Sequence, residues 1–397
     1  MSKTESSIIS DNELYSFNKG GSGSCHILYD LANWKNGLAF KNIDFSPTGK
    51  PVIKIAELND GIGPTTAYTE KEYPKEVYLQ KGDFLFSWSG NPQTSIDIYK
   101  FQMQEGWLNQ HIFKVIPNEK LVHRDFFFYL MKALKPNFTK IATNKQTTGL
   151  GHVTIADLKR LEVTIPDYNK QKKIAQILLS LDEKIELNNA INRNLEEQAQ
   201  AIFKSWFVDF EPFGGTMPED WKLGTVADIT VSHDSKRIPL SGMQRDFMKK
   251  IYPYYGATSC MDYVEDYIFD GIYLLLGEDG TVVDKDGFPI LQYVEGKFWV
   301  NNHAHILTGK SGYSVEMLYL FFSLTKVQEI VTGAVQPKIS QGRLNGLTAI
   351  IPDEKTSKAF DEIIQPMFRQ IRLIRQETQR LTSLRDVLLP KLISREC

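Results

Sequence analysis

Two stretches of the sequence decide the fold, and both begin with the same tripeptide. The first reads IPDYNKQKKIAQILLSLDEKIELNNAINRNLEEQAQAIFKSWFVDF over residues 165–210. The second reads IPDEKTSKAFDEIIQPMFRQIRLIRQETQRLTSLRDVLLPKLIS over residues 351–394. Ile165-Pro166-Asp167 therefore returns 186 positions later as Ile351-Pro352-Asp353. Apolar residues follow at heptad spacing in both stretches, which is typical of long amphipathic helices.

The apolar positions of the two stretches stay in register. Those of the first are Ile174, Leu178, Leu181, Ile185, Leu195, Ala199, Ile202 and Trp206. Those of the second are Phe360, Ile364, Met367, Ile371, Ile374, Leu381 and Leu388. A shift of 186 positions places seven of the first eight on apolar residues, the exception being Arg385. The sequence is therefore a duplication, and the two helices are expected to pair antiparallel as a coiled coil with these residues in its seam.

The ends of the helices carry their own signals. Asp167 and Asp353 lie just before each apolar run, where a helix N-cap is expected. The first helix should end near Asp209, because Pro212 follows shortly. About 40 residues at ~1.5 Å each would make a rod of about 60 Å.

Three residues inside the two apolar runs depart from the helical pattern. Asn188 and Asn192 occupy seam positions, and two interpretations remain open: control of helix register at a cost in stability, or a place where the seam loosens or turns to a partner. Pro366 lies inside the second run and predicts a kink or a restart of that helix.

Weaker repeats lie upstream of each helix. Residues 107–111 resemble residues 299–303, and residues 148–155 resemble residues 332–339. The expected order is a tail (1–23), a globular segment (24–166), a helix (167–211), a second globular segment (212–352) and a second helix (353–397). Both globular segments should be α+β. Predicted strands are Val77–Leu79, Asp83–Trp88, His111–Ile116, Tyr273–Leu276 and Phe298–Leu307, and predicted helices are Arg124–Leu134 and Val315–Thr325.

Composition bounds the class of protein. The 397 residues are 42% hydrophobic and 12% aromatic, which suits two folded domains. The three cysteines lie far apart, so reduced thiols are expected rather than a disulfide framework or a zinc site. No apolar run approaches the ~20 residues of a membrane span, so a soluble, cytoplasmic protein without membrane contact is expected. A net charge of −2 argues against a protein that simply coats nucleic acid.

Catalytic motifs are absent in convincing form. Residues 304–311 fit a relaxed phosphate-loop pattern, but most of them continue a predicted strand. Residues 284–287 begin like a calcium loop that lacks its glycine, and Asp353 is better explained as a helix cap than as part of a nuclease site. His303 and His305 are best read as core or surface residues. We therefore predict no catalytic residue, no metal and no cofactor. A nucleotide hydrolase acting through Lys310, or a coiled-coil scaffold binding protein or RNA, remains as an alternative.

With the duplication established, the sequence resembles the specificity (S) subunits of type I restriction-modification systems. The resemblance covers nearly the whole chain from about Ser24. It rests on linked motifs in the order of that family, namely residues 34–41, 49–55, 81–87, 168–175, 218–224, 235–239, 252–257, 267–271, 274–280 and 336–340. It implies that each globular segment is a target-recognition domain, called here reader 1 (24–166) and reader 2 (212–352).

The resemblance also implies a function and partners. The chain would be a non-catalytic subunit that recognises a bipartite, asymmetric target in double-stranded DNA. Its helices would bind two methyltransferase (M) subunits, and restriction (R) subunits would join them. If the helices hold the readers apart rigidly, the two half-sites would lie about one helical turn apart, near 34–36 Å.

Polar and aromatic residues in predicted loops are the candidates for DNA contact. In reader 1 they are Trp34, Lys35, Asn36, Lys41, Asn144, Lys145, Gln146 and Thr147. In reader 2 they are Lys236, Arg237, Tyr254, Tyr255, Gln336, Lys338, Gln341 and Arg343. The alternative is that Tyr254 and Tyr255 are core aromatics and that the lysines are merely solvated.

Overall fold

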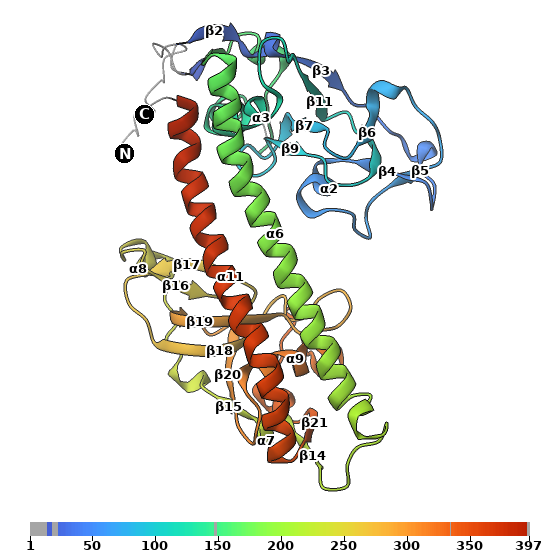
Figure 1. Cartoon of the computed structure of the whole chain (residues 1–397), viewed down its shortest axis with the longest axis vertical. Helices are drawn as coiled ribbons and strands as arrows, with labels where there is room; N and C mark the ends of the chain where they lie inside the picture. Colours follow the sequence, from blue (N-terminus) through green and yellow to red (C-terminus); the bar gives the residue numbers. More distant parts are fainter. Residues whose placement is uncertain (1–13, 18–22, 147–148, 334, 395–397) are drawn as a thin grey trace. The chain divides into compact units, whose positions relative to one another are not determined.

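The computed structural model describes residues 14–17, 23–146, 149–333 and 335–394. The chain divides into two compact units (Figure 1). Unit 1 comprises Met1–Glu186 and Thr378–Cys397, and unit 2 comprises Leu187–Glu377. Both boundaries fall inside the long helices, so each helix contributes to both units. In the part of the chain that the structure describes, every helix is too short or too polar to span a membrane.

The two long helices begin where the sequence predicts. Helix α6 spans Tyr168–Phe207 and helix α11 spans Glu354–Ser394. Oδ1 of Asp167 accepts a hydrogen bond from the Lys170 amide at 3.0 Å, and Oδ1 of Asp353 accepts one from the Thr356 amide at 3.0 Å. Both aspartates are therefore N-caps, as predicted. Helix α6 ends two residues short of the predicted Asp209.

Helix α11 runs unbroken through Pro366, so the predicted restart is wrong. Pro366 is exposed, while Ile364 and Phe368 on either side of it are buried. Solvent can therefore satisfy the carbonyl that loses its amide partner, while the flanking side chains hold the helix against the core.

The helices pack antiparallel, as predicted. In unit 1, Arg385 forms an ion pair with Asp182 at 2.9 Å. In unit 2, Arg375 forms an ion pair with Glu196 at 2.6 Å. Residue numbers thus fall along α11 as they rise along α6. Asn188 lies between these pairs, buried, and its side-chain amide donates to Glu377 at 2.8 Å. This cross-helix bond is what register control requires.

The apolar stripe of each helix also completes the core of a reader. Ile174 and Leu178 are buried in the core of reader 1, and Phe360, Ile364 and Ile371 in the core of reader 2. Ala199 and Ile374 are also buried. The remaining seam residues are half-buried, namely Leu181, Ile185, Leu195, Ile202, Trp206, Met367, Leu381 and Leu388. The stripe therefore packs on a reader as well as on the other helix, and the pair is more than an isolated coiled coil.

Reader 1 is built from short strands and four α-helices in its described part. The strands are β1 (Ser16–Phe17), β2 (Ser24–Ile27), β3 (Ala32–Asn36), β4 (Lys50–Ile53), β5 (Tyr68–Thr69), β6 (Tyr78–Gln80), β7 (Phe84–Ser87), β8 (Ser89–Gly90), β9 (Asp97–Lys100), β10 (Glu105–Leu108), β11 (Ile112–Pro117), β12 (Gly151–His152) and β13 (Glu162–Ile165). The helices are α2 (Ile55–Asp60), α3 (Arg124–Ala133), α4 (Lys135–Asn144) and α5 (Ile155–Leu158).

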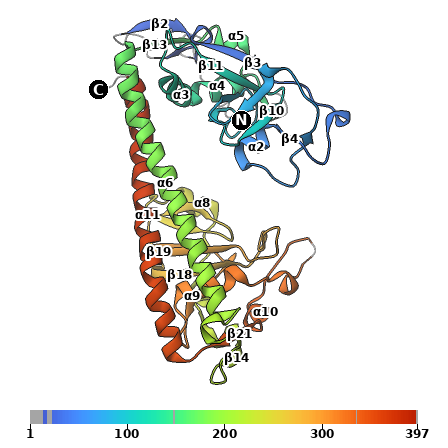
Figure 2. The same ribbon diagram turned by 45° about the vertical axis from the view of Figure 1, so that its right-hand side comes forward.

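Two four-stranded sheets, β3-β11-β7-β9 and β5-β4-β10-β6, form the body of reader 1. Helices α3 and α4 lie against the first sheet and share its core (Figure 2). A small sheet, β1-β13-β2, leads into α6. Strand β1 corrects the predicted tail. Leu14 and Tyr15 are buried, and the Tyr15 hydroxyl donates to Asp157 at 2.8 Å, so residues 14–17 belong to reader 1.

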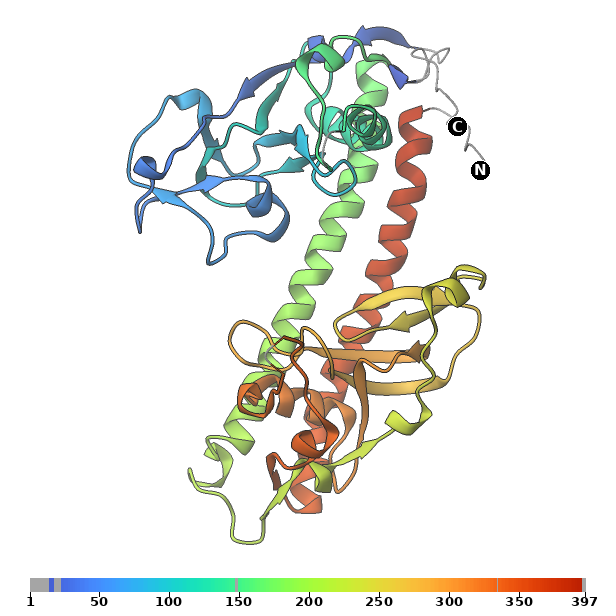
Figure 3. The same ribbon diagram turned by 180° about the vertical axis from the view of Figure 1, so that it is seen from behind.

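Reader 2 has one large sheet in its described part. Its strands are β14 (Lys222–Thr225), β15 (Thr230–Ser232), β16 (Tyr252–Tyr255), β17 (Cys260–Val264), β18 (Phe269–Gly277), β19 (Leu291–Val300), β20 (Ala304–Gly309) and β21 (Thr348–Ile351). Its helices are α7 (Val226–Ile229), α8 (Gly242–Asp246), α9 (Val315–Leu324) and α10 (Gln341–Asn345). The sheet order is β15-β20-β18-β19-β16-β17, with β14 and β21 paired separately. Figure 3 shows reader 2, coloured yellow to orange, from behind. The prediction of one continuous strand over Phe298–Leu307 is wrong, because a turn at residues 301–303 separates β19 from β20.

The two readers share one topology, which confirms the duplication. The order β3-β11-β7 matches β15-β20-β18, and β5-β4-β10 matches β17-β16-β19. The matching pairs β4-β10 and β16-β19 are both parallel: Trp107 faces Val52 in the first, and Trp299 faces Tyr254 in the second. Gly149 and Gly333, which are 184 positions apart, both have φ of 87°, a conformation that favours glycine. The readers differ in one respect. The two sheets of reader 1 are separate, whereas the paired long strands β18 and β19 join the matching strands of reader 2 into a single sheet.

Candidate DNA interface

Turns from several strands of reader 2 surround a hollow of about 380 Å³. Its lining residues are Gly256, Ala257, Thr258, Ser259, Met261, Asp279, Thr281, Asn301, His303 and Gln336. Gln336 is the one candidate from the sequence among them. The hydroxyl and amide groups of this set can both donate and accept, which is what reading of base edges requires. The other lining residues were missed because they come from separate turns, and no local motif marks them.

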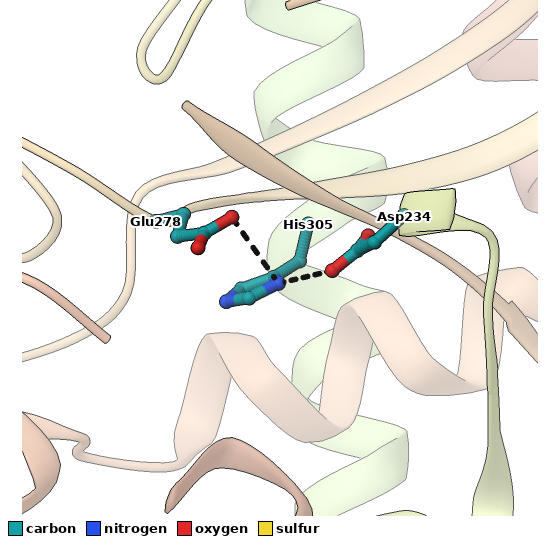
Figure 4. A group of neighbouring side chains, drawn as sticks. All are labelled: Asp234, Glu278 and His305. Atoms are coloured by element: carbon teal, nitrogen blue, oxygen red, sulfur yellow. Dashed lines mark hydrogen bonds and ion pairs between the residues drawn. The ribbon is translucent and has the colours of Figure 1, made fainter. Parts of the chain in front are cut away.

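A buried cluster of charged side chains lies beside these turns (Figure 4). Nδ1 of His305 is 2.6 Å from a carboxylate oxygen of Asp234 and 3.7 Å from one of Glu278. Nε2 of the same ring is 2.8 Å from the carbonyl oxygen of Ile339. Both ring nitrogens therefore face acceptors, so the ring carries both protons and a positive charge.

The pKa values of the cluster follow from this geometry. Burial opposes the charged ring, but the hydrogen bond to Asp234 and its negative charge outweigh burial and raise the pKa of His305. Burial likewise opposes the charged carboxylate, but hydrogen bonds from His305 and from the Ile306 amide lower the pKa of Asp234. The pair is therefore held in its ionised form.

The same cluster ties two loops together. Arg237 binds Glu278 at 2.5 Å and the carbonyl oxygen of Ala304 at 2.9 Å. Lys338 binds Glu278 at 3.3 Å from the other side. Exposed Lys236 precedes Arg237 and exposed Gln336 precedes Lys338, so both candidates lie on loops that the cluster fixes.

Asp234, Glu278 and His305 are also the residues whose ligand atoms lie close enough to suggest a metal site. A metal ligand must offer a ring nitrogen with a free lone pair. Because both nitrogens of His305 bond to acceptors, neither has one to offer. These residues therefore form a structural ion-pair cluster and do not fit a metal site.

The other candidates of reader 2 divide by exposure. Tyr254 is buried, with its hydroxyl accepting from the Leu240 amide at 3.0 Å, so the core interpretation holds for it. Tyr255 is half-buried, and burial raises its pKa to about 12. The guanidinium of Arg237 is occupied by Glu278 and the Ala304 carbonyl oxygen, so it is not free to contact a base. Gln341 and Arg343 are exposed at the start of α10.

The candidates of reader 1 divide in the same way. Trp34 is buried and donates to the Tyr29 carbonyl at 2.9 Å, so it is a core residue and not a DNA contact. Lys35 is half-buried, and Asn36 is exposed. Lys41 is exposed in the loop between β3 and β4.

The second loop of reader 1 follows α4. Asn144 at the end of α4 and Lys145 and Gln146 after it are exposed, although Lys145 forms an ion pair with Asp157. Thr147 lies outside the described residues. The exposed candidates therefore come from two separate loops of this reader.

The rejected motifs have structural explanations. Residues 304–309 of the phosphate-loop pattern are strand β20, whose backbone amides serve the sheet. The aspartate-rich stretch 284–287 is a turn in which Asp284 accepts from the amides of Asp286 and Phe288, both at 2.9 Å. Cys25 and Cys260 are exposed free thiols, as expected for reduced cysteines, and Cys397 lies outside the described residues.

The sequence matches the family model of the type I restriction modification DNA specificity domain twice, over residues 27–197 and 218–383. The chain belongs to this family. It is the specificity subunit of a type I restriction-modification system, a non-catalytic component that recognises a DNA target. The two matched copies coincide with the duplication described above.

Known relatives agree with this assignment. The MjaIX specificity subunit of Methanocaldococcus jannaschii is 24% identical over 91% of this chain and 96% of its own length. The HindI specificity subunit of Haemophilus influenzae is 37% identical over 34% of this chain and 29% of its own. The solved S subunit from M. genitalium has the same fold, with a TM-score of 0.59 at 17% identity over 94% of this chain and 97% of that one.

Proposed function

We propose that reader 1 and reader 2 each recognise one half of a bipartite, asymmetric target in double-stranded DNA. The observation that carries this proposal is the shared topology of two readers with separate cores and different loops. A duplicated framework supplies two equivalent recognition surfaces, and different loops read different bases.

The difference between the loops supports the asymmetry. Reader 1 joins β4 to β5 through helix α2, whereas reader 2 joins β16 to β17 by the short turn 256–259. That turn lines the hollow of reader 2, where Thr258 and Ser259 offer hydroxyl groups. No equivalent short turn exists in the described part of reader 1. Two such surfaces would not accept the same sequence, so a palindrome is not expected.

We further propose that the solvent-facing sides of α6 and α11 bind two M subunits and that R subunits join this complex in the cytoplasm. Both helices expose large apolar residues, namely Ile177, Leu187, Ile363, Leu373, Leu384 and Val387. Apolar residues repeated along an exposed helix face are typical of a protein interface. Basic residues also concentrate in α11 from Met367 onward. Without M subunits to cover these apolar and basic faces, the chain alone should be poorly soluble or bind DNA weakly.

Methylome sequencing of cells that express this chain with its M partner tests the proposal. The expected result is one methylated motif made of two unlike half-sites separated by unread bases. A continuous palindrome would contradict it. Tight, sequence-specific binding by the isolated chain would contradict the requirement for M subunits.

A further inference from the structure

The loop between β15 and β16 of reader 2 exposes apolar side chains while two of its cations are bound to one carboxylate. Nη1 of Arg245 binds Asp262 at 2.9 Å, and Nζ of Lys250 binds the same carboxylate at 2.9 Å. Met243 and Phe247, by contrast, are 74% and 88% exposed. Large apolar side chains are rarely held this far out in solvent on a loop that ion pairs anchor. This loop therefore marks an interaction surface.

Met243 and Phe247 form one face of a short, well-anchored turn. They are four positions apart, and the backbone of Phe247 is still helical, with φ of −87° and ψ of −9° at the end of α8. Residues at this spacing lie side by side on a helix. Ser241 caps the turn by accepting from the Gln244 amide at 3.2 Å, and the Arg245 guanidinium lies 4.9 Å from the centre of the Tyr254 ring. The two side chains are therefore presented on a fixed support.

Reader 1 repeats this feature in the corresponding loop, between β3 and β4. Ile43 is 80% exposed there, two residues after exposed Lys41. Lys71 holds the loop by donating to the Ile43 carbonyl at 2.9 Å and binding Asp44 at 3.0 Å. Two loops that share a place in the topology, but not a sequence, thus each hold an apolar side chain out into solvent.

The charge of the reader 2 loop points to DNA as the occupant. Residues 236–250 hold five cations against the single acid Asp246. Arg237 is paired with Glu278, and Arg245 and Lys250 are paired with Asp262. The exposed Lys236 and Lys249 are therefore the cations that remain for contact with phosphates. The whole chain has a net charge of −2. Positive charge concentrated around apolar side chains matches a base step between phosphates.

We propose that Phe247 with Met243 in reader 2, and Ile43 in reader 1, are apolar wedges that insert against a base step of their own half-site. A wedge unstacks one step partially and bends the duplex toward the protein. It makes the energy of binding depend on how easily that step deforms, which adds specificity without a hydrogen bond to a base. This inference rests on the proposed function, because it assumes that each reader meets its own half-site.

The test uses this chain in complex with its M partner and a duplex that carries the methylated motif. 2-Aminopurine is placed in turn at each step of both half-sites, and its fluorescence reports unstacking. Fluorescence anisotropy gives Kd for the wild type, Phe247→Ala, Phe247→Leu and Ile43→Ala. Leu223→Ala is the matched control, because Leu223 on β14 is 68% exposed and lies outside the loop.

We expect Phe247→Ala to raise Kd about tenfold, the lower range for loss of one stacked aromatic. It should abolish the fluorescence signal in the reader 2 half-site only, whereas Ile43→Ala should abolish it in the reader 1 half-site only. Phe247→Leu should retain most of the affinity, because leucine also serves as a wedge. Leu223→Ala should stay within twofold of the wild type.

Unchanged affinity and unchanged fluorescence in Phe247→Ala would overturn the wedge. Loss of assembly with the M subunit in Phe247→Ala, without any change in DNA binding once assembled, would also overturn it and assign the loop to a protein contact. If the wild-type complex shows no preference for any duplex, the proposed function itself fails, which is a separate result.

Discussion

Strand β11 of reader 1 places Phe113 in an aromatic core, with its ring centre 6.1 Å from that of Trp34. Strand β20 of reader 2 places His305 at the position 192 residues later, in the same offset that relates Trp107 to Trp299. There the side chain is buried in the ionic cluster with Asp234 and Glu278. The same framework position is thus filled by aromatic packing in one reader and by buried charge in the other.

This difference teaches what a duplication preserves. The parts next to the long helices repeat closely: β13 pairs with β2 before α6, and β21 pairs with β14 before α11. The loops and the chemistry that supports them have diverged. The helix-proximal framework is therefore constrained by the shared helices, whereas each reader is free to stabilise its own recognition loops in its own way.

The largest expected effect comes from changing the framework that both readers share. Insertion of seven residues into each long helix, after Glu186 and after Glu377, adds two turns to both and keeps the seam in register. Seven residues lengthen a helix by about 10 Å, equivalent to about three base pairs. Methylome sequencing should find both half-sites unchanged and the spacer longer. Insertion in α6 alone is the control, and it should impair activity because α11 no longer matches.

Removal of each supporting side chain should destabilise only its own unit. Phe113→Ala leaves a cavity in reader 1 and should cost about 4 kcal/mol. His305→Ala removes the cation that hydrogen-bonds to the largely buried carboxylate of Asp234 and should cost about 3 kcal/mol. Hydrogen exchange of the full chain, read separately at β11 and β20, measures both. Loss of protection in both units from either variant would show that the units are not independent.

The ionic cluster should make the stability of unit 2 depend on pH. The raised pKa of His305 stabilises the fold fully below its ordinary value of 6.5, and this contribution is lost as pH rises through the raised value. The lowered pKa of Asp234 stabilises the fold above its ordinary value of 3.8 and is lost as pH falls. Protection at β20 should therefore decline above about neutral pH, after correction for intrinsic exchange, while β11 shows no such decline. His305→Gln should remove the difference.

The smallest expected effect concerns the two helix caps. Asp167→Ala and Asp353→Ala should each cost about 1 kcal/mol, measured as faster exchange in the first turn of α6 or α11. Asp353→Ala should cost more, because Trp221 also donates its ring N–H to Asp353, at 3.1 Å. The matching Asp→Asn variants should retain most of the stability, since asparagine caps as well. Equal costs for the two alanine variants would mean that the Trp221 contact contributes nothing.

The sequence predicted the features that depend on local pattern. Periodicity and capping signals predicted the two long helices and their N-caps. They also predicted the shorter helices Arg124–Leu134 and Val315–Thr325. All of these appear in the structure. The candidate contacts were less predictable, because a polar side chain gives no sign of its partner. Arg237 looks like a base reader until Glu278 is placed beside it, and that residue lies 41 positions away. Trp34 likewise looks like an exposed aromatic residue in the sequence, and only the tertiary structure shows that it is buried in the core of reader 1.

Exchange of reader 1 tests the central claim most directly. Residues 24–165 are replaced by the first reader of another family member whose target is known, and the methylome of cells with the M partner is sequenced. Because each reader has its own core and its own loops, one half-site should change to that of the donor while the other half-site and the spacer stay as they are. A change in both half-sites, or a single continuous motif, would contradict the account.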